Sequence, residues 1–265
     1  PMGLRAFSVG YRAEPLPAVI AEKTRIENER LRVTLDADGI LTSLYDKLAC
    51  REVLAGEGNL LTVFQDKCVH ETAWNLELNY QKKFWELRGA QSIEVLEANE
   101  LRGVVRVVRV FNNSRITQDI ILYTGADRLD FVTTVDWYES DKLLKAAFTV
   151  DILSTRASFE IAHGAISRPT HWNNGFDRAR FEQSAHKWAD LSEGGYGVSL
   201  LNDCKYGYDI KDNVMRLSLL RAPTCPDRTG DHGINTFTYS VYPHENDWRD
   251  AQTVRRGLEL NCPPE

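Results

Sequence analysis

The sequence lacks a net positive charge, a long apolar run and a basic leader, and each absence excludes a class of protein. The 265 residues carry a formal net charge of −6 at pH 7. No basic field is therefore available to hold phosphates, and neither nucleic acid nor an anionic membrane is an expected partner. No apolar run approaches the roughly 20 residues that a membrane-spanning helix requires. The first residues have no basic lead or apolar core, so we expect no signal peptide.

The sequence also lacks paired cysteines and the common catalytic motifs. Its five cysteines are scattered and show no CxxC spacing, which is typical neither of a disulfide framework nor of a zinc knuckle. The reducing cytoplasm is the location that this pattern favours. There is no P-loop, no GxGxxG and no GxSxG, so nucleotide chemistry and an activated serine have no supporting motif.

What the sequence does contain is a long series of β-strand patterns. From Glu29 onward, short β-branched and aromatic runs alternate with turn signals. RLRVTL, DADG and ILTSLY predict a hairpin in which Gly39 supplies a positive φ. GVVRVVRVF, ITQDIILY and LDFVTTVDW predict a meander, and in the last run alternate residues from Leu129 to Trp137 share one apolar face. We therefore expect an all-β fold of large antiparallel sheets stacked as a sandwich over residues 25–265.

Two segments depart from the strand pattern. Residues 1–24 carry prolines and little periodicity, so we expect a linker that enters the domain. Near the end, Asn246 or Asp247 is suited to cap a short C-terminal helix. The apolar residues that recur at helical spacing in this predicted helix are Trp248, Ala251, Val254 and Leu258.

The stretch from Arg168 to Tyr208 is rich in histidine, aspartate and tryptophan. If Arg180–Leu191 is a strand, its alternation places His186, Trp188 and Asp190 on one face. Tryptophan can stack on a sugar ring while charged groups bond its hydroxyls, so these three are weaker candidates for substrate binding. A solvated face, or one packed on another domain, has the same pattern. Both interpretations stay open.

The same stretch holds residue types that bind zinc, namely His171, Asp177, His186 and Asp190. They lack a compact spacing such as HExxH, which holds two ligands on one face of a helix. We therefore predict no metal site in this chain.

Several long stretches resemble the C-terminal β region of glycoside hydrolase family 38 α-mannosidases, of the cytosolic and vacuolar branch. They are IENERLRVTLDADGILTSLYDKLACREVL, RPTHWNNGFDRARFEQSAHKWADLSEGGYGVSLLNDCKYGYDI, LSLLRAPTCPD, YSVYPH and RRGLELNCPP. The resemblance implies an antiparallel β supersandwich of the galactose-mutarotase-like type. It also implies that residues 1–24 are the tail of a preceding region, and that the chain is a fragment of a longer enzyme.

The resemblance implies that the whole enzyme removes terminal α-mannose from oligosaccharides with retention, in the cytoplasm. Its nucleophile and its zinc ligands would lie in an N-terminal barrel and helical region that this chain lacks. Zinc would thus belong to the full-length enzyme, and no catalytic residue, metal ligand or cofactor is expected here. The expected partners are an α-mannoside oligosaccharide and the N-terminal barrel and helical regions of the same polypeptide.

Substrate-binding candidates come from two places that match family motifs. In DKCVHETAWN, relatives tend to show D-x-P-x-x-x-D-A-W-D; Asp66, Ala73 and Trp74 keep this pattern, whereas Cys68, Thr72 and Asn75 depart from it. Trp74 could stack on sugar and Asn75 could hydrogen-bond. Arg221, at a predicted strand end in LSLLRAP, could bond mannose hydroxyls or form a salt bridge at the domain interface.

Two other functional classes stay open. A stand-alone carbohydrate-binding or aldose-epimerase-like module would have a related fold, with His171 or His186 as its histidine. A purely structural β domain that docks on its barrel would need no sugar contact.

Overall fold

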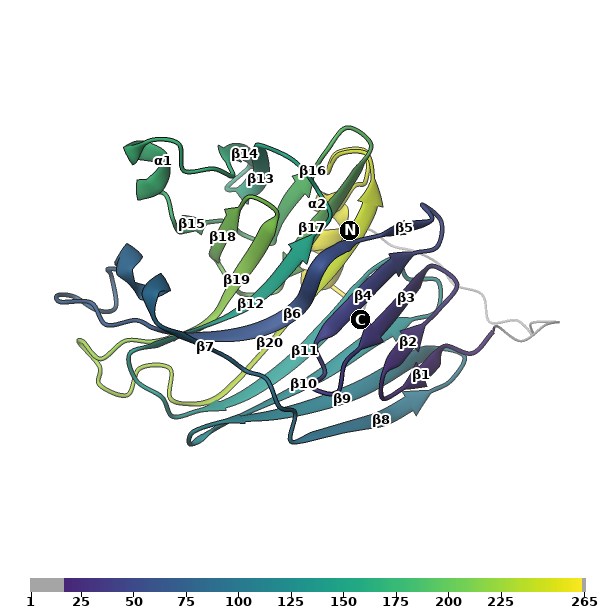
Figure 1. Cartoon of the computed structure of the whole chain (residues 1–265), viewed down its shortest axis with the longest axis horizontal. Helices are drawn as coiled ribbons and strands as arrows, with labels where there is room; N and C mark the ends of the chain where they lie inside the picture. The colour runs from purple at the N-terminus through teal and green to yellow at the C-terminus, as the bar shows by residue number, and fades with distance from the viewer. Residues whose placement is uncertain (1–16, 264–265) are drawn as a thin grey trace.

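Two large antiparallel β-sheets stack face to face in the computed structural model, which describes residues 17–263 (Figure 1). Within that range the first sheet has 11 strands and the second has nine. In order of neighbours, the first sheet contains β1 (Ile20–Glu22), β2 (Arg25–Glu27), β3 (Leu31–Leu35), β4 (Leu41–Asp46), β6 (Leu54–Gln65), β12 (Lys142–Val150), β19 (Val214–Ala222), β18 (Gly207–Lys211) and β15 (Gln183–Ser184), with β5 (Arg51–Glu52) on β4 and β7 (Phe84–Glu86) on β6.

The second sheet follows the order β14 (Gly164–Pro169), β13 (Arg156–Ile161), β16 (Trp188–Ser192), β17 (Tyr196–Asn202), β20 (Gly233–Glu245), β11 (Leu129–Trp137), β10 (Ser114–Tyr123), β9 (Arg102–Phe111) and β8 (Ser92–Ala98). The described residues also form the 3₁₀ helix η1 (Leu78–Lys82) and the helices α1 (Gly175–Ala179) and α2 (Thr253–Asn261). The predicted all-β sandwich is confirmed. No helix in residues 17–263 is long and apolar enough to cross a membrane.

The local predictions that rest on strict alternation are confirmed. Strands β3 and β4 form the predicted hairpin, and Gly39 in its turn has φ +71°. Strands β9, β10 and β11 form the predicted meander. The alternate residues of β11 from Leu129 to Trp137 are fully buried, because that face turns toward the first sheet.

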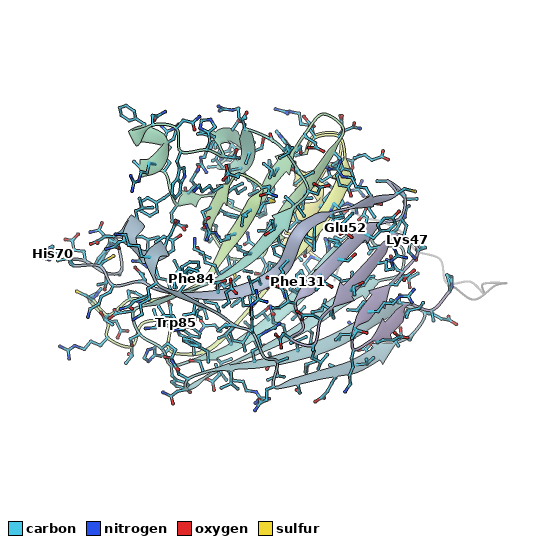
Figure 2. All side chains as sticks on the ribbon, viewed as in Figure 1. Lys47, Glu52, His70, Phe84, Trp85 and Phe131 are labelled. Atoms are coloured by element: carbon cyan, nitrogen blue, oxygen red, sulfur yellow. The ribbon has the colours of Figure 1, made fainter. Side chains whose placement is uncertain are left out.

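The core lies between the two sheets and joins aromatic rings from both. Phe131 on β11 stacks on Tyr239 of β20 at a centroid distance of 5.0 Å. Its ring also meets the edge of Phe148, on β12 of the first sheet, at 5.7 Å. Phe131 lies between the sheets in the middle of the molecule (Figure 2). Such contacts stabilise the stack beyond the area they bury.

Two predicted boundaries differ from the structure. The expected linker of residues 1–24 lies largely outside the described residues, and within it Ile20–Glu22 already forms strand β1 of the first sheet. The C-terminal helix begins at Thr253, later than the predicted cap at Asn246 or Asp247. The reason is local: Asp247 accepts hydrogen bonds in a separate turn, and Gln252 has φ +55°, which interrupts a right-handed helix.

Candidate functional site

A loop of residues 66–77, called the 66–77 loop below, connects β6 to η1 at one end of the sandwich. His70 marks this end in Figure 2, while Lys47 and Glu52 mark the opposite end. Within the loop, Glu71 takes φ +53°, and its carbonyl accepts hydrogen bonds from the amides of Trp74 and Asn75 at 2.9 and 3.0 Å. This tight turn leaves the Trp74 side chain 71 % exposed. An aromatic ring is thus presented to solvent on a structured backbone.

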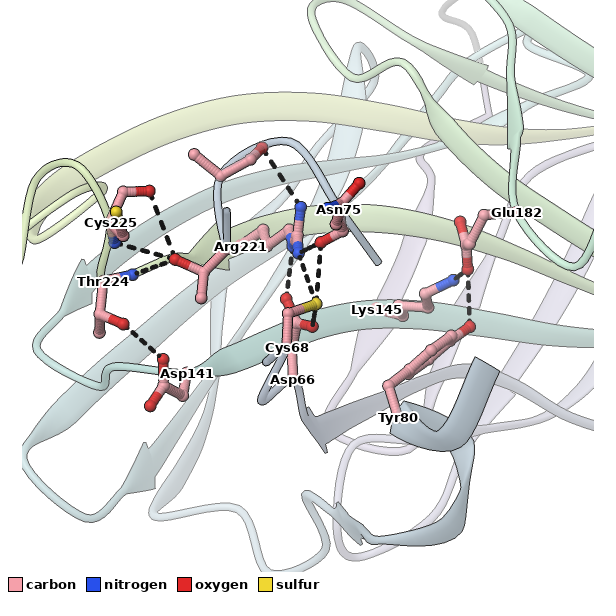
Figure 3. Close-up of polar contacts among 12 residues, drawn as sticks. Asp66, Cys68, Asn75, Tyr80, Asp141, Lys145, Glu182, Arg221, Thr224 and Cys225 are labelled. Carbon is pink, nitrogen blue, oxygen red and sulfur yellow. Dashed lines mark hydrogen bonds and ion pairs between the residues drawn. The ribbon is translucent and has the colours of Figure 1, made fainter. Parts of the chain in front are cut away.

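The guanidinium of Arg221, near the end of β19, clamps the 66–77 loop (Figure 3). Its Nε donates to the carboxylate of Asp66, and its Nη2 donates to the carbonyl of Asn75. Its Nη1 makes a longer bond, of 3.4 Å, to the carbonyl of Ala73. The two sequence motifs that supplied Arg221 and Asn75 therefore meet in space. The Asp66 pair is a salt bridge within this domain, with the side chain of Asp66 only 3 % exposed.

Cys68 and Thr72, two departures from the family motif, add further bonds to the same loop. The Thr72 hydroxyl oxygen accepts from the backbone amides of Thr224 and Cys225 at 3.0 and 2.9 Å, as a carboxylate oxygen would. The Cys68 thiol lies 3.0 Å from the Asn75 carbonyl. Burial, together with the nearby Asp66 charge, raises the pKa of Cys68, so this thiol keeps its proton and donates. The loop is thereby held without a charged residue at position 72 or 75.

A largely buried cluster of charges lies beneath η1, on the outer face of the first sheet. We call its five residues the Lys145 cluster: Tyr80, Lys145, Glu182, Asp209 and Arg216. Lys145 is fully buried on β12, and its ammonium contacts both Glu182 and Asp209. The Tyr80 hydroxyl donates to Glu182 at 2.6 Å, and Arg216 donates to Asp209 at 2.7 Å. Two cations thus face two carboxylates.

The protonation states within the Lys145 cluster follow from burial and from the shared ammonium. Burial raises the pKa of Glu182 to about 7; Lys145 opposes this rise and the Asp209 charge adds to it. Burial also raises the pKa of Tyr80, so its hydroxyl remains a donor. Although burial disfavours its charge, the carboxylates of Asp209 and Glu182 raise the pKa of Lys145, which stays protonated.

The prediction of one continuous strand over Arg180–Leu191 is wrong. Arg180 follows helix α1, Gln183–Ser184 forms β15 in the first sheet, and Trp188–Ser192 forms β16 in the second. The chain crosses from one sheet to the other between these strands, so His186 does not belong to the strand face that Trp188 and Asp190 share in β16. Period-2 alternation survives such a crossing, and the sequence therefore could not show it.

Trp188 and Asp190 are each only 1 % exposed, which removes them from any open surface. Trp188 packs against Trp248 at a centroid distance of 4.9 Å, beside helix α2. Asp190 accepts from the Ser199 hydroxyl at 2.8 Å and lies 2.8 Å from His244 Nε2. Both residues bind their own chain, so the expectation that they form an open sugar-binding face is not met.

His186 is half-buried and lies apart from Asp190. It lines a cavity of about 300 Å³ together with Lys187, Asn202, Asp203, Tyr206 and Asn261. A larger cavity, of about 410 Å³, is lined by residues of both sheets and of the C-terminal segment, including Leu31, Tyr242, His244 and Arg256.

The four zinc-type residues do not converge. His171 Nδ1 lies 3.5 Å from the Asp177 carboxylate beside α1, whereas Asp190 is paired with His244. In the part of the chain that the structure describes, no group of three or more His, Cys, Asp or Glu residues is placed to hold a metal ion. The residues present therefore do not fit a zinc centre.

Sequence reasoning missed the Lys145 cluster and His244. A lysine inside the apolar strand KLLKAAFTV was the available signal, because lysine is almost never fully buried unless it is paired. The partners themselves come from distant segments, and no spacing rule connects residues 80, 145, 182 and 209.

Comparisons with known proteins agree on one family. The profile described as "Glycosyl hydrolases family 38 C-terminal domain" matches residues 26–229. Alpha-mannosidase G of Dictyostelium discoideum is 40 % identical over 245 residues, which cover 89 % of this chain and 22 % of that protein. Alpha-mannosidase 2C1 of Homo sapiens is 38 % identical over 255 residues, which cover 93 % of this chain and 24 % of that protein.

Solved structures show the same fold. A crystal structure of an alpha-mannosidase from Enterococcus faecalis V583 superposes with a TM-score of 0.79 at 14 % identity, covering 95 % of this chain and 32 % of that one. The present chain spans about a quarter of the length of the curated relatives that it matches.

Proposed function

Because the chain belongs to the C-terminal domain family of the family 38 glycosyl hydrolases, we propose that it is the non-catalytic β domain of a longer α-mannosidase, and that its 66–77 loop lines part of the mannoside site. The observation that carries this proposal is the exposed Trp74 on a loop that the domain holds rigidly through Arg221.

The chemistry of the loop suits a sugar. The flat faces of a sugar ring stack on an indole, while an amide can donate to and accept from hydroxyls. Asn75 follows Trp74 directly and is exposed, and within residues 17–263 its side-chain nitrogen makes one bond, of 3.4 Å, to the His70 carbonyl. We therefore assign Trp74 to stacking and Asn75 to hydroxyl binding.

In this proposal the main role of Arg221 is to hold the 66–77 loop. Its Nε and Nη2 are committed to Asp66 and Asn75, so a mannose hydroxyl would be bound by Nη1, which carries a second N–H beyond its long bond to Ala73. The same guanidinium can then order the loop and contact substrate.

The catalytic groups are proposed to lie elsewhere in the whole polypeptide. Retaining hydrolysis needs two carboxyl groups about 5–5.5 Å apart on either side of the glycosidic bond. The largely buried carboxylates of Asp66, Glu182, Asp209 and Asp190 are paired with Arg221, Lys145 and His244, so they are not free for that role. We assign the nucleophile and zinc to an N-terminal barrel and helical region, with cytoplasmic free oligosaccharides as substrate.

Hydrolysis of a chromogenic α-mannoside by matched samples tests this division of labour. The purified 265-residue chain is expected to release no chromophore above the buffer rate, and the whole protein is expected to be active and to lose activity with a chelator. Hydrolysis by the 265-residue chain itself would refute the proposal.

A stand-alone carbohydrate-binding or aldose-epimerase-like module is the second candidate. The observation that favours it is the cavity that brings His186 and Asp203 together, since sugar epimerisation uses a histidine with a carboxylate. Rapid interconversion of sugar anomers by this chain, abolished by His186→Ala, would support this candidate over the first.

A further inference from the structure

The 66–77 loop is held at both of its ends. Arg221 binds the Asp66 carboxylate at the start of the loop, and the same guanidinium binds the Asn75 carbonyl near the end of the loop. The chain then enters η1, where Tyr80 is 1 % exposed. The Tyr80 ring meets the edge of Phe64 at a centroid distance of 5.2 Å, and its hydroxyl reaches Glu182. Figure 3 shows both attachments side by side.

Glu182 makes this second attachment from a distant part of the sequence. It lies in the bend between α1 and β15, and it accepts from Lys145 of β12 as well as from Tyr80. The only hydrogen bond from Tyr80 to a carboxylate among the described residues is this one. A displacement of Glu182 would therefore be transmitted to η1 and to the loop directly before it.

Stability alone does not account for the Lys145 cluster. Desolvating two cations and two carboxylates is costly, and well-packed apolar residues of similar volume are often as stabilising as buried ion pairs. The apolar core between the sheets is complete without this cluster, which lies on the outer face under η1. Directional hydrogen bonds fix one orientation of Tyr80, which apolar packing alone would not do.

We propose that Glu182 is a positioning residue that orients the 66–77 loop through the Tyr80 hydroxyl and so sets the affinity of the assembled enzyme for its mannoside. This inference rests on the proposed function, because it takes Trp74 and Asn75 as the sugar contacts. Glu182 touches no substrate, and its effect passes through Tyr80.

The charges around Glu182 give the positioning a pH dependence. Glu182 faces Lys145 of β12, Asp209 of β18 and Tyr80 of η1, while Arg216 of β19 pairs with Asp209. Burial under η1 raises the pKa of Glu182 to about 7. Lifting η1 would rehydrate the carboxyl and bring its pKa back toward its usual range. A rise in pH through 7 therefore favours the lifted, looser loop.

Hydrogen exchange of the backbone amides in residues 66–77 of this chain tests the positioning without any substrate. Tyr80→Phe keeps the ring and deletes the hydroxyl, and Glu182→Ala deletes the acceptor; each is expected to speed exchange in the loop about tenfold, because the hydrogen bond between Tyr80 and Glu182 is lost. Glu182→Gln keeps the acceptor and is expected to exchange as the wild type does at pH 6. It is also expected to lack the further acceleration, corrected for intrinsic rates, that the wild type shows between pH 6 and 8.

A matched control and a fold check accompany these variants. Glu57→Gln removes an exposed carboxylate from β6 that pairs with Arg88, so it is expected to leave exchange in the loop unchanged. Exchange in β20, the middle strand of the second sheet, reports whether each variant remains folded.

Kinetics of the whole enzyme complete the test. Tyr80→Phe is expected to raise KM for a mannoside at least threefold with kcat within twofold. Glu182→Gln, which keeps the acceptor, is expected to have the wild-type KM at pH 6. Unchanged loop exchange in both Tyr80→Phe and Glu182→Ala overturns the positioning role. An unchanged KM in Tyr80→Phe also overturns it when Trp74→Ala raises KM. If Trp74→Ala itself leaves KM unchanged, the proposed function fails instead, and the exchange result still decides whether Glu182 orients the loop.

Discussion

Replacing Arg221 by alanine is expected to release the 66–77 loop while leaving the sandwich folded. The substitution removes the ion pair with Asp66 and the bonds to the Ala73 and Asn75 carbonyls. The side chain of Asp66 is 3 % exposed, so its carboxylate would remain buried without its cation. No other contact described for the loop replaces that charge.

The magnitude follows from the partial exposure of this pair. Removing one partner of a fully buried ion pair costs about 3–5 kcal/mol, and an exposed pair contributes at most about 1 kcal/mol. The Arg221 side chain is 22 % exposed, so water can reach part of the vacated space. We expect a loss near the middle of this range, about 2–3 kcal/mol, as local opening of the loop.

Limited proteolysis within residues 66–77 measures this opening, and urea denaturation measures global stability. Cleavage is expected to accelerate by about 30- to 150-fold if opening is a pre-equilibrium, since 1.4 kcal/mol corresponds to a tenfold change. Arg221→Lys is the matched variant. It keeps the charge for Asp66 but lacks the fork that binds the Asn75 carbonyl, so an intermediate rate is expected.

A different outcome would refute this reasoning. If Arg221→Ala leaves cleavage of the loop at the wild-type rate while it raises KM in the whole enzyme, the guanidinium acts on substrate directly and does not hold the loop.

Three further predictions concern stability. Because burial raises the pKa of Glu182 from 4.5 to about 7, its stabilising contribution is complete below pH 4.5 and lost as pH rises through 7; the free energy of unfolding from urea denaturation should therefore fall more between pH 5 and 8 in the wild type than in Glu182→Gln, and equal falls would contradict this assignment. Trp188→Ala should cost about 3–5 kcal/mol in the same assay with KM of the whole enzyme unchanged, and a raised KM would return Trp188 to the site. Gly39→Ala should cost at least about 1 kcal/mol, because φ is +71° and a Cβ would lie 2.6 Å from Val107; a neutral result would contradict the strained turn.

The sheets could be predicted from sequence wherever one physical rule fixed one answer. Gly39 in DADG can adopt the positive φ that its turn requires and that other residues rarely adopt. The alternate residues of β11 from Leu129 to Trp137 form one face that has to be buried in the core. The stretch Arg180–Leu191 obeyed the same alternation, yet it crosses between sheets. Burial against α2 and exposure to a sugar produce the same polar-aromatic pattern, so periodicity could not place Trp188 or Asp190.

The candidate site could be predicted only in part. The family motifs identified Trp74, Asn75 and Arg221, and the structure brings the last two together. Their bonding could not be foreseen, because Arg221 binds the loop through backbone carbonyls, which no side-chain pattern records. The ion pair of Lys145 and Glu182 could not be predicted for a similar reason, because it depends on tertiary contacts between β12 and a bend after α1.

The central claim is that the 66–77 loop of this domain lines the sugar site of a whole α-mannosidase, and KM of the whole enzyme with Trp74→Ala tests it most directly. The matched control is Leu101→Ala, since Leu101 is 72 % exposed but lies in the β8–β9 turn at the opposite end of the sandwich (Figure 1). The account predicts a KM for mannoside raised about fivefold or more by Trp74→Ala, as expected for a lost stacking contact of about 1 kcal/mol, and unchanged by Leu101→Ala. Equal KM values in both variants and wild type would contradict it.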